Sequence, residues 1–234
     1  MTALKIVLLV IGGYLIGCFS SAKFLSRLKK DDITKHGSGN PGTMNMLRTY
    51  GFKFGALTLI MDALKGAIPS LVGFLIFGGS SGGELAYIGL FIGGISSILG
   101  HIFPVFNKFK GGKGVACIVG MFAVAEPLWA LLAFVVCFLY LIIFKYGVLA
   151  SFIFITTLTV IEGYKFRENI TICILLFGVF CCIWYMHRQN FFRLLIGKEN
   201  KVNLFKKKNK SPEEKQAQKE LKKLSKNKKY KEIG

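Results

Sequence analysis

The chain has 234 residues and a formal net charge of +19, and 53% of its residues are Ala, Val, Ile, Leu, Met, Phe, Trp, Tyr or Cys. A soluble domain has about 45–50% apolar residues even when glycine is counted, and this chain has 27 glycines in addition. The composition excludes an ordinary soluble globular protein and indicates an integral membrane protein. The charge is uneven, because residues 201–234 contain 13 Lys and 4 Glu.

Seven apolar segments separated by polar residues predict the spans. They lie at 3–20, 54–77, 85–106, 115–126, 128–144, 147–162 and 169–186. A full span needs about 20 apolar residues, so the fourth, fifth and sixth segments are short. We expect an all-α bundle of seven transmembrane helices, with five or six spans as the alternative if short segments merge. The first segment is interpreted as a helix, because cleavage at the lipoprotein-like LIGC would place a basic segment outside.

Charge in the connections predicts the orientation. Segments 20–53, 107–114 and the C-terminal segment are basic, whereas the alternate connections at 78–84, 126–127 and 162–168 are acidic or balanced. The positive-inside rule then places the basic segments in the cytoplasm and the N-terminus outside. All three polar segments described next would share the cytoplasmic face, which favours an enzyme acting at one leaflet.

The first polar segment, KHGSGNPGTMNMLR, runs from Lys35 to Arg48. It combines glycines, neutral hydrogen-bonding side chains and a cation: Gly37, Gly39, Gly42, Ser38, Asn40, Asn45 and Arg48. Glycines allow unusual backbone angles and close approach of a ligand, and a guanidinium has the planar fork that suits phosphate. A plain turn needs only one glycine, so we interpret this segment as an anion-binding loop.

The second polar segment, GHIFPVFNKFKGGKGVA, follows the third apolar segment. It is not a Walker A loop, because glycine follows its second lysine. Its glycines allow a nest of backbone amides for an anion, and its lysines add charge. The residues concerned are Lys110, Gly111, Gly112, Lys113 and Gly114. The alternative is that the lysines only set the topology.

The third polar segment, HRQNFFRLLIGKE, begins where the last apolar segment ends. His187 and Asn190 are three residues apart, so a continued helix would place them on one face. Arg188 and Arg193 are expected to contact lipid phosphates. A single histidine at the end of a span is commonly a capped interfacial residue, and His187 alone would be a weak catalytic candidate.

Two ionisable residues, Asp62 and Lys65, lie within the second apolar segment. Their spacing allows an ion pair, and charges within a span have a functional or structural-polar role. We expect Asp62 to hold Lys65 or Arg48 in place. The six cysteines lie in apolar stretches without CxxC spacing, so we expect neither disulfides nor a metal site. The chain has no HExxH motif, aspartate cluster or Ser-His-Asp order, which disfavours metal-dependent phosphotransfer and a covalent nucleophile.

These segments together resemble the bacterial acyl-phosphate:glycerol-3-phosphate acyltransferases over about residues 8–200. The likeness is carried by GYLIGCFSSAKFL, GSGNPGTMN with its following arginine, DALKGAIP, GHIFPVFNKFKGGKGVA and HRQNFFRLLIGKE. Met44 stands where the family has a threonine, and Cys117 stands where threonine is common. The family ends near Glu199, so the basic tail at 201–234 is a separate segment about which the resemblance says nothing.

The resemblance implies a seven-helix bundle that transfers an acyl group from acyl phosphate to the 1-hydroxyl of glycerol 3-phosphate, without a cofactor. It implies catalytic roles for Ser38, Arg48, His187 and Asn190. It implies that Gly111, Gly112, Lys113 and Gly114 contribute to glycerol 3-phosphate binding. From their residue types, we also expect substrate binding by Gly37, Gly39, Asn40, Asn45 and Lys110. Asp62, Lys65, His101 and Glu199 are assigned supporting structural roles.

The expected location is the bacterial cell membrane, with the active site facing the cytoplasm. Expected partners are the two substrates and the lipid bilayer, with anionic lipid for a tail that is partly helical or disordered, and no nucleic acid. The alternative function is a membrane carrier or binding protein for phosphorylated metabolites, which would account for the anion loops and the spans. We see no inverted repeat of the kind that carriers have.

Overall fold

The computed structural model describes residues 2–78, 83–202 and 204, and these residues form helices and connecting turns. Within this part of the chain the helices follow one another in the order given next. They are α1 (Thr2–Cys18), α2 (Ser21–Leu28), η1 (Ile33–Lys35), α3 (Thr43–Tyr50), α4 (Phe52–Ile76), α5 (Glu84–Ile102), η2 (Val105–Asn107), α6 (Val115–Ala125), α7 (Pro127–Phe144), α8 (Gly147–Lys165) and α9 (Ile170–Leu195).

Six stretches among the described residues are long and apolar enough to cross a membrane. They are Thr2–Leu28, Phe52–Ile76, Glu84–Asn107, Pro127–Phe144, Gly147–Lys165 and Ile170–Leu195. This confirms an all-helical chain with several spans. The seventh apolar segment forms α6, which has only 11 residues, so a count of seven spans stays a prediction, as does the orientation. Helix α9 continues past the end of its apolar segment, to Leu195.

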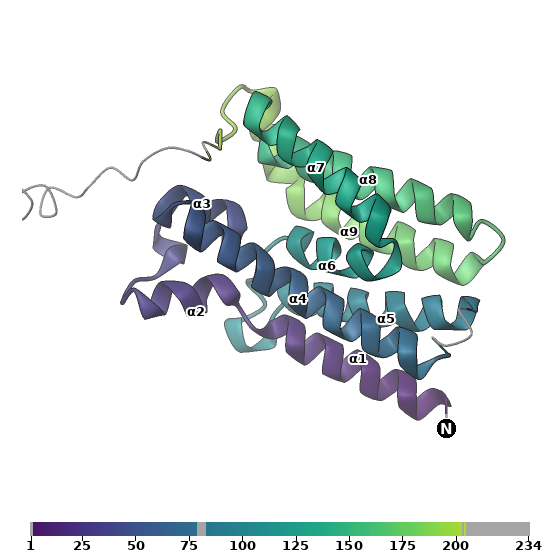
Figure 1. Ribbon diagram of the computed structural model, residues 1–234. Coiled ribbons are helices and arrows are strands. Elements are labelled where there is room, and N and C mark those ends of the chain that lie inside the picture. Colours follow the sequence, from purple (N-terminus) through teal and green to yellow (C-terminus); the bar gives the residue numbers. More distant parts are fainter. Residues whose placement is uncertain (1, 79–82, 203, 205–234) are drawn as a thin grey trace, which may run out of the picture. The chain divides into compact units, whose positions relative to one another are not determined.

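Helices α1, α4 and α5 form one side of the bundle and α7, α8 and α9 form the other, with the short α6 between them (Figure 1). Close approach depends on glycine at two of the contacts. A Cβ at Gly120 of α6 would collide with the backbone carbonyl of Ala63 in α4, and one at Gly17 of α1 would collide with the carbonyl of Ser97 in α5. Small residues of this kind let membrane helices pack backbone against backbone.

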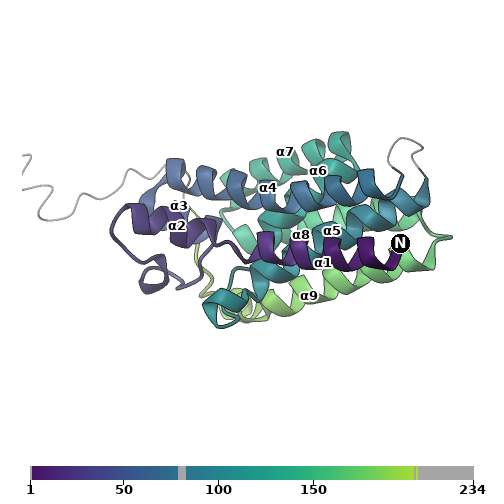
Figure 2. The same cartoon turned by 90° about the horizontal axis from the view of Figure 1, so that it is seen from below.

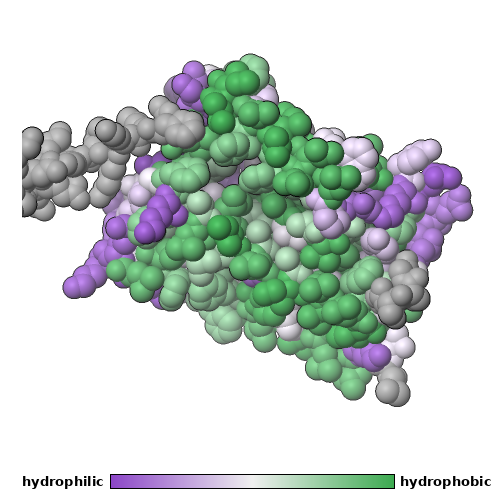
Figure 3. All heavy atoms as spheres, viewed as in Figure 1, coloured by the Kyte–Doolittle hydropathy of each residue, from purple (hydrophilic) through white to green (hydrophobic). Residues whose placement is uncertain are grey.

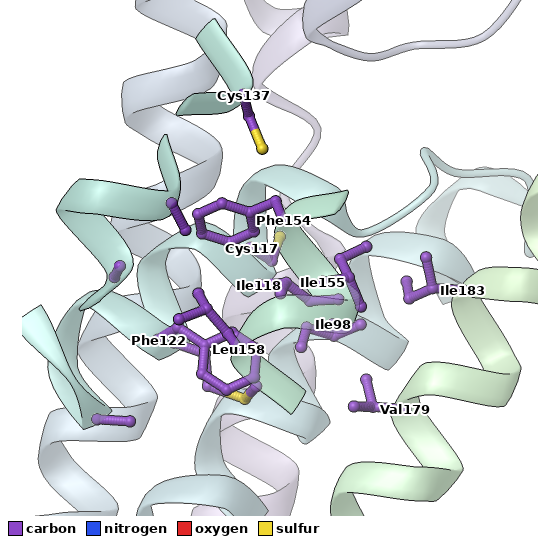
Figure 4. Close-up of a cluster of buried hydrophobic side chains, with 14 of the residues drawn as sticks. Ile98, Cys117, Ile118, Phe122, Cys137, Phe154, Ile155, Leu158, Val179 and Ile183 are labelled. Carbon is purple, nitrogen blue, oxygen red and sulfur yellow. The ribbon is translucent and has the colours of Figure 1, made fainter. Parts of the chain in front are cut away.

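A buried apolar cluster joins α5, α6, α8 and α9 (Figure 4). Phe122 and Leu158 are fully buried at its centre, and Ile98 and Ile183 extend it to α5 and α9. The outside of the bundle is also apolar, and hydrophilic residues gather toward its two ends (Figure 3). Leu131 and Phe177, for example, are 59% and 67% exposed. Such a continuous apolar belt fits a lipid environment rather than water.

The short elements α2, α3, η1 and η2 lie at one end of the bundle, opposite the end that carries the start of α1 and the α8–α9 turn (Figures 1 and 2). This end therefore collects the glycine-rich segments that the sequence singles out. The packed part of the chain continues beyond residue 200, because Val202 and Leu204 are buried. Of the tail predicted at 201–234, residues 203 and 205–234 lie outside the described residues.

Candidate active site

A cavity of about 490 Å³ opens among α3, α4, α6, α7, α8 and α9. Polar and charged side chains form part of its lining: Ser38, Asn40, Thr43, Asn45, Arg48, Asp62, His101, Lys113, Ser151, His187, Asn190, Arg193, Glu199 and Asn200. Apolar side chains of α4, α6, α7 and α8 form much of the rest, among them Leu59, Val119, Phe134, Phe138 and Phe154. A concave, largely apolar site with a few convergent polar groups is typical of a small-molecule pocket.

Asn45 of α3 fixes the loop that carries Ser38. Its Oδ1 accepts a hydrogen bond from the backbone N–H of Ser38 at 3.1 Å, and its Nδ2 donates to the carbonyls of Ile33 at 3.2 Å and His36 at 2.9 Å. Both N–H groups of the amide are therefore used by backbone carbonyls, and its oxygen accepts one backbone N–H. Asn45 thus holds the loop and also lines the cavity, and its predicted contact with substrate stays a prediction.

Gly37 belongs to the same arrangement. Its φ of +56° is one that side-chain-bearing residues adopt rarely, and a Cβ there would collide with Oδ1 of Asn45. Gly37 and Gly39, which has φ of +70°, do not line the cavity. These glycines allow the loop to fold over Asn45, and their predicted role as substrate contacts stays a prediction.

A carboxylate anchors the beginning of this loop. Asp31 lies within 2.9 Å of Nε2 of His36 and accepts a hydrogen bond from the hydroxyl of Tyr50 at 2.8 Å. The hydrogen bond from His36, with that from Tyr50, lowers the pKa of Asp31 to about 2. Burial and the same carboxylate raise the pKa of Tyr50 to about 12. The Asp31 carboxylate thus ties the loop to the end of α3.

The second glycine-rich segment uses its amides differently from the prediction. The N–H of Gly111 donates to the carbonyl of Ile102 at 3.1 Å, and that of Gly112 donates to the carbonyl of His101 at 3.0 Å. These bonds satisfy carbonyls at the C-terminus of α5. Neither glycine lines the cavity and Lys110 is exposed outside it. The amides of Gly111 and Gly112 thus cap α5 instead of joining Gly114 in the expected nest, and substrate binding by this segment stays a prediction.

Lys113 and Gly114, in contrast, do line the cavity. The ammonium of Lys113 donates a hydrogen bond to Oδ1 of Asn190. Burial, together with nearby Arg193 and Arg48, lowers the pKa of Lys113 to about 8, although Glu199 acts in the opposite direction.

Asn190 continues this contact into a chain of polar groups. Its Nδ2 donates to Oε1 of Glu199 at 2.8 Å, and Oε2 of Glu199 accepts from Nε of Arg193 at 3.0 Å. Glu199 is buried, and its contacts accord with the supporting role assigned to it. Arg193 was expected to face lipid phosphates but instead lines the cavity. Its spacing of three residues from Asn190 is the sequence signal that could have revealed this.

Arg48 reaches the cavity from the end of α3. One terminal nitrogen, Nη2, donates to the backbone carbonyl of Asn200 at 3.2 Å, and Nε is buried without a hydrogen-bond partner among the described residues. Burial lowers the pKa of Arg48; Glu199 raises it and Arg193 lowers it. A guanidinium with unused donors in such a place is suited to an anionic oxygen.

His187 lies on the same face of α9 as Asn190, as its spacing predicts, and both line the cavity. Nδ1 of His187 lies 2.9 Å from the carbonyl of Ile183. A carbonyl only accepts, so Nδ1 carries the hydrogen, and Nε2 of the neutral ring is an acceptor. The ring is buried, with Phe152 edge-on at a centroid distance of 5.5 Å.

A second polar cluster lies deeper, between α2, α4 and α5. The expected pair is present: Nζ of Lys65 lies 2.8 Å from Oδ1 of Asp62. The same Oδ1 accepts from the Ser21 hydroxyl at 2.7 Å and lies 3.8 Å from Nδ1 of His101. Lys65 also donates to the carbonyl of Phe19 at 2.7 Å. Asp62 therefore holds Lys65 and not Arg48.

The structure thus brings most of the predicted polar residues to one cavity, from three segments far apart in the sequence. Gly37, Gly39, Lys65, Lys110, Gly111 and Gly112 lie outside its lining. Among the described residues, no group of three or more His, Cys, Asp and Glu side chains is placed to hold a metal ion. Three cationic side chains line the cavity: Arg48, Lys113 and Arg193. Two carboxylates also line it, Glu199 and Asp62, and Asp62 is paired with Lys65.

Known proteins are similar to this chain in sequence and fold. The family described as glycerol-3-phosphate acyltransferase matches residues 7–197. Relatives of that name from Thermoanaerobacter pseudethanolicus and Aquifex aeolicus are 36% and 37% identical over 84% and 85% of this chain, covering 95% and 100% of their own.

Two crystal structures of PlsY (YgiH), an integral membrane glycerol 3-phosphate acyltransferase, have the same fold. The glycerol 3-phosphate form has a TM-score of 0.76 at 33% identity, covering 86% of this chain and 100% of its own. The lysophosphatidic acid form has a TM-score of 0.74 at 34% identity, covering 86% and 96%. The chain therefore belongs to the glycerol-3-phosphate acyltransferase family.

Proposed function

We propose that this membrane acyltransferase moves a fatty acyl group from acyl phosphate to the 1-hydroxyl of glycerol 3-phosphate. The observation that carries the proposal is the mixed character of one cavity. Its polar part has an excess of cations, which suits phosphate groups, while its α4, α7 and α8 walls are apolar and suit an acyl chain. The related crystal structures, of a glycerol 3-phosphate form and a lysophosphatidic acid form, support the same acceptor and product.

The chemistry needs no enzyme nucleophile, because acyl phosphate is an activated mixed anhydride. The 1-hydroxyl oxygen attacks the acyl carbon, the carbon–oxygen bond to phosphate breaks, and the hydroxyl proton leaves with inorganic phosphate. The products are lysophosphatidic acid and phosphate. Catalysis then depends on positioning and on stabilisation of charge at the carbonyl and phosphate oxygens.

The predicted catalytic residues have distinct tasks in this scheme. Nε2 of His187 accepts the hydrogen bond of the attacking hydroxyl and orients it. Ser38 donates to the acyl carbonyl oxygen, and Arg48 binds a phosphate through its unused donors. Asn190 keeps Lys113 in place for the second phosphate. Asn40 and Gly114, which line the same cavity, are proposed to contact substrate.

Release of phosphate tests the proposal directly. Purified protein in detergent should release inorganic phosphate and form lysophosphatidic acid only when acyl phosphate and glycerol 3-phosphate are both present. A carrier, the alternative function, would bind phosphorylated metabolites without consuming them. His187→Ala serves as the inactive control, and substrate consumption by this variant at the wild-type rate would contradict the site assignment.

We further propose that the enzyme resides in the bacterial cell membrane with its cavity facing the cytoplasm. The basic connections lie at the cavity end, and lysine-rich and arginine-rich loops remain inside. The segment from 205 onward would then be a basic cytoplasmic tail on the membrane domain. Labelling of cysteines introduced at Lys35 and at Glu168 in intact cells tests this: only the residue at 168 should react with an impermeant reagent.

A further inference from the structure

The chain continues to build the site beyond the family match, which ends at residue 197. Val202 and Leu204 are 1% and 8% exposed and belong to the same apolar core as α7 and α8. We call residues 200–202 and 204 the C-terminal strap. Asn200 and Lys201 are exposed, but the two buried side chains are under the same packing constraints as those of a helix in the core.

The strap is attached on one side to the turn between α7 and α8. The N–H of Val202 donates to the carbonyl of Lys145 at 2.7 Å, and Nζ of Lys201 lies 5.5 Å from the ring centre of Tyr146. A side-chain carbon at Gly147 would lie 3.6 Å from Cγ2 of Val202. The strap is thus attached there by a hydrogen bond, by a cation–π contact and by packing.

On its other side the strap holds α3, because the carbonyl of Asn200 accepts the hydrogen bond from Nη2 of Arg48. Helix α3 packs on α4, whereas α7 packs on α8 and α6. The strap therefore links the two sides of the bundle between which the cavity lies. Asn200 and Leu204 also line the cavity themselves.

We propose that the C-terminal strap completes the active site by holding Arg48 in its phosphate-binding position and by fixing the position of α3 relative to the α7–α8 turn. This inference rests on the proposed function. Asn200 and Val202 are positioning residues that act through Arg48. A guanidinium with one nitrogen fixed on a carbonyl presents its remaining donors in a defined direction, so less entropy is lost when it binds an anion.

Two truncations test this. Deleting 206–234 keeps the strap, and we expect kcat and both KM values to stay within about twofold of the full chain. Deleting 200–234 removes it but retains Glu199, and we expect kcat/KM to fall by about tenfold or more, as for loss of a hydrogen bond to a charged group. Equal activity of the two truncated proteins would overturn the proposal.

Point variants separate positioning from general destabilisation. Val202→Asp should lower activity and Val202→Ile should retain it, with melting temperatures measured in parallel. Deleting 200–234 should lower kcat/KM by a much smaller factor when Arg48 is already replaced by Gln, because the strap acts through the Arg48 side chain. A loss of the same factor in the wild-type and Arg48→Gln backgrounds would show that the strap only stabilises the fold.

One readout is independent of catalysis. Stabilisation of the folded protein by added glycerol 3-phosphate should be present in the 206–234 deletion and reduced in the 200–234 deletion. If the full chain releases no phosphate from acyl phosphate, the proposed reaction is wrong, and this comparison still decides whether the strap supports anion binding. Equal stabilisation of both truncated proteins would refute the strap's role.

Discussion

Gly112 lies against the imidazole of His101 so closely that a side-chain carbon on Gly112 would collide with Nε2 of that ring. The ring has little room to move, because His101 is buried beside Asp62. The N–H of Gly112 meanwhile donates to the carbonyl of His101. The glycine-rich segment is therefore fixed on the end of α5, and this placement sets where Lys113 enters the cavity.

Gly112→Ala should lower stability and kcat together, rather than raise only the KM for glycerol 3-phosphate. The added carbon overpacks a buried contact, at a cost of about 1–3 kcal/mol, and displaces Lys113. Melting temperature and steady-state kinetics in detergent measure both effects. Gly178→Ala is the matched control, because open space surrounds Gly178. An unchanged melting temperature with a raised KM would restore the phosphate-nest interpretation.

Arg48→Lys should lose about 100-fold or more in kcat/KM. One guanidinium nitrogen is committed to Asn200 while Nε remains for a ligand, and an ammonium group cannot reproduce this fork. Kinetics with each substrate varied in turn locate the loss. A stably expressed variant with near-normal rates would mean that Arg48 acts only through its charge.

Asn45→Asp should inactivate the enzyme although it changes little in size. The carboxylate keeps the acceptor for Ser38 but replaces both donors to Ile33 and His36 with an anion facing two carbonyls. Each unsatisfied buried group costs about 1–3 kcal/mol, and the Ser38 loop should detach. Protease sensitivity near residue 38, compared with Thr49→Ala, measures this. Intact activity of Asn45→Asp would show that the loop holds by other contacts.

Side-chain spacing on helices was the reliable part of the sequence interpretation. It placed Asp62 beside Lys65 and His187 beside Asn190, because three residues along a helix return to one face. Glycines were less informative: the sequence shows that the backbone at 111–112 is free to bend, but not that its amides meet the α5 carbonyls. The strap was missed for a related reason, since its partner Lys145 becomes a neighbour only through tertiary packing. Arg193 was missed although its spacing from Asn190 places both on one face of α9.

The affinity for glycerol 3-phosphate should fall as pH rises from 7 to 9. Burial, with Arg193 and Arg48, lowers the pKa of Lys113 to about 8, so the side chain is cationic below this pH and neutral above it. Since kcat/KM reports ionisations of the free enzyme, its decline should be centred near pH 8. Lys113→Arg should remove this decline because arginine stays charged. An identical pH profile in both proteins would assign the decline to another group.

Removal of residues 206–234 should leave turnover in neutral detergent unchanged and weaken the attraction of this region to anionic lipid. The sequence SPEEKQAQKELKKLSKNKKYKEI begins with a helix-start signal: Ser211 as cap, Pro212 at the first position and Glu214 closing a capping box. Ala217 and Leu221 begin a narrow apolar stripe, and lysines dominate the rest.

Whether this segment is helical or solvated, its lysines are the groups that anionic lipid would attract. Each lysine near an anionic leaflet contributes about 1 kcal/mol, and salt screens the attraction within about 8–10 Å at physiological ionic strength. A synthetic peptide of residues 206–234 should therefore bind vesicles that contain anionic lipid, dissociate from them at high salt, and not bind neutral vesicles. Salt-independent binding would indicate an apolar anchor instead. Loss of turnover in neutral detergent on deletion would mean that this segment supports the cavity at His187 and Asn190 directly, because no lipid surface is present there to respond to its charge.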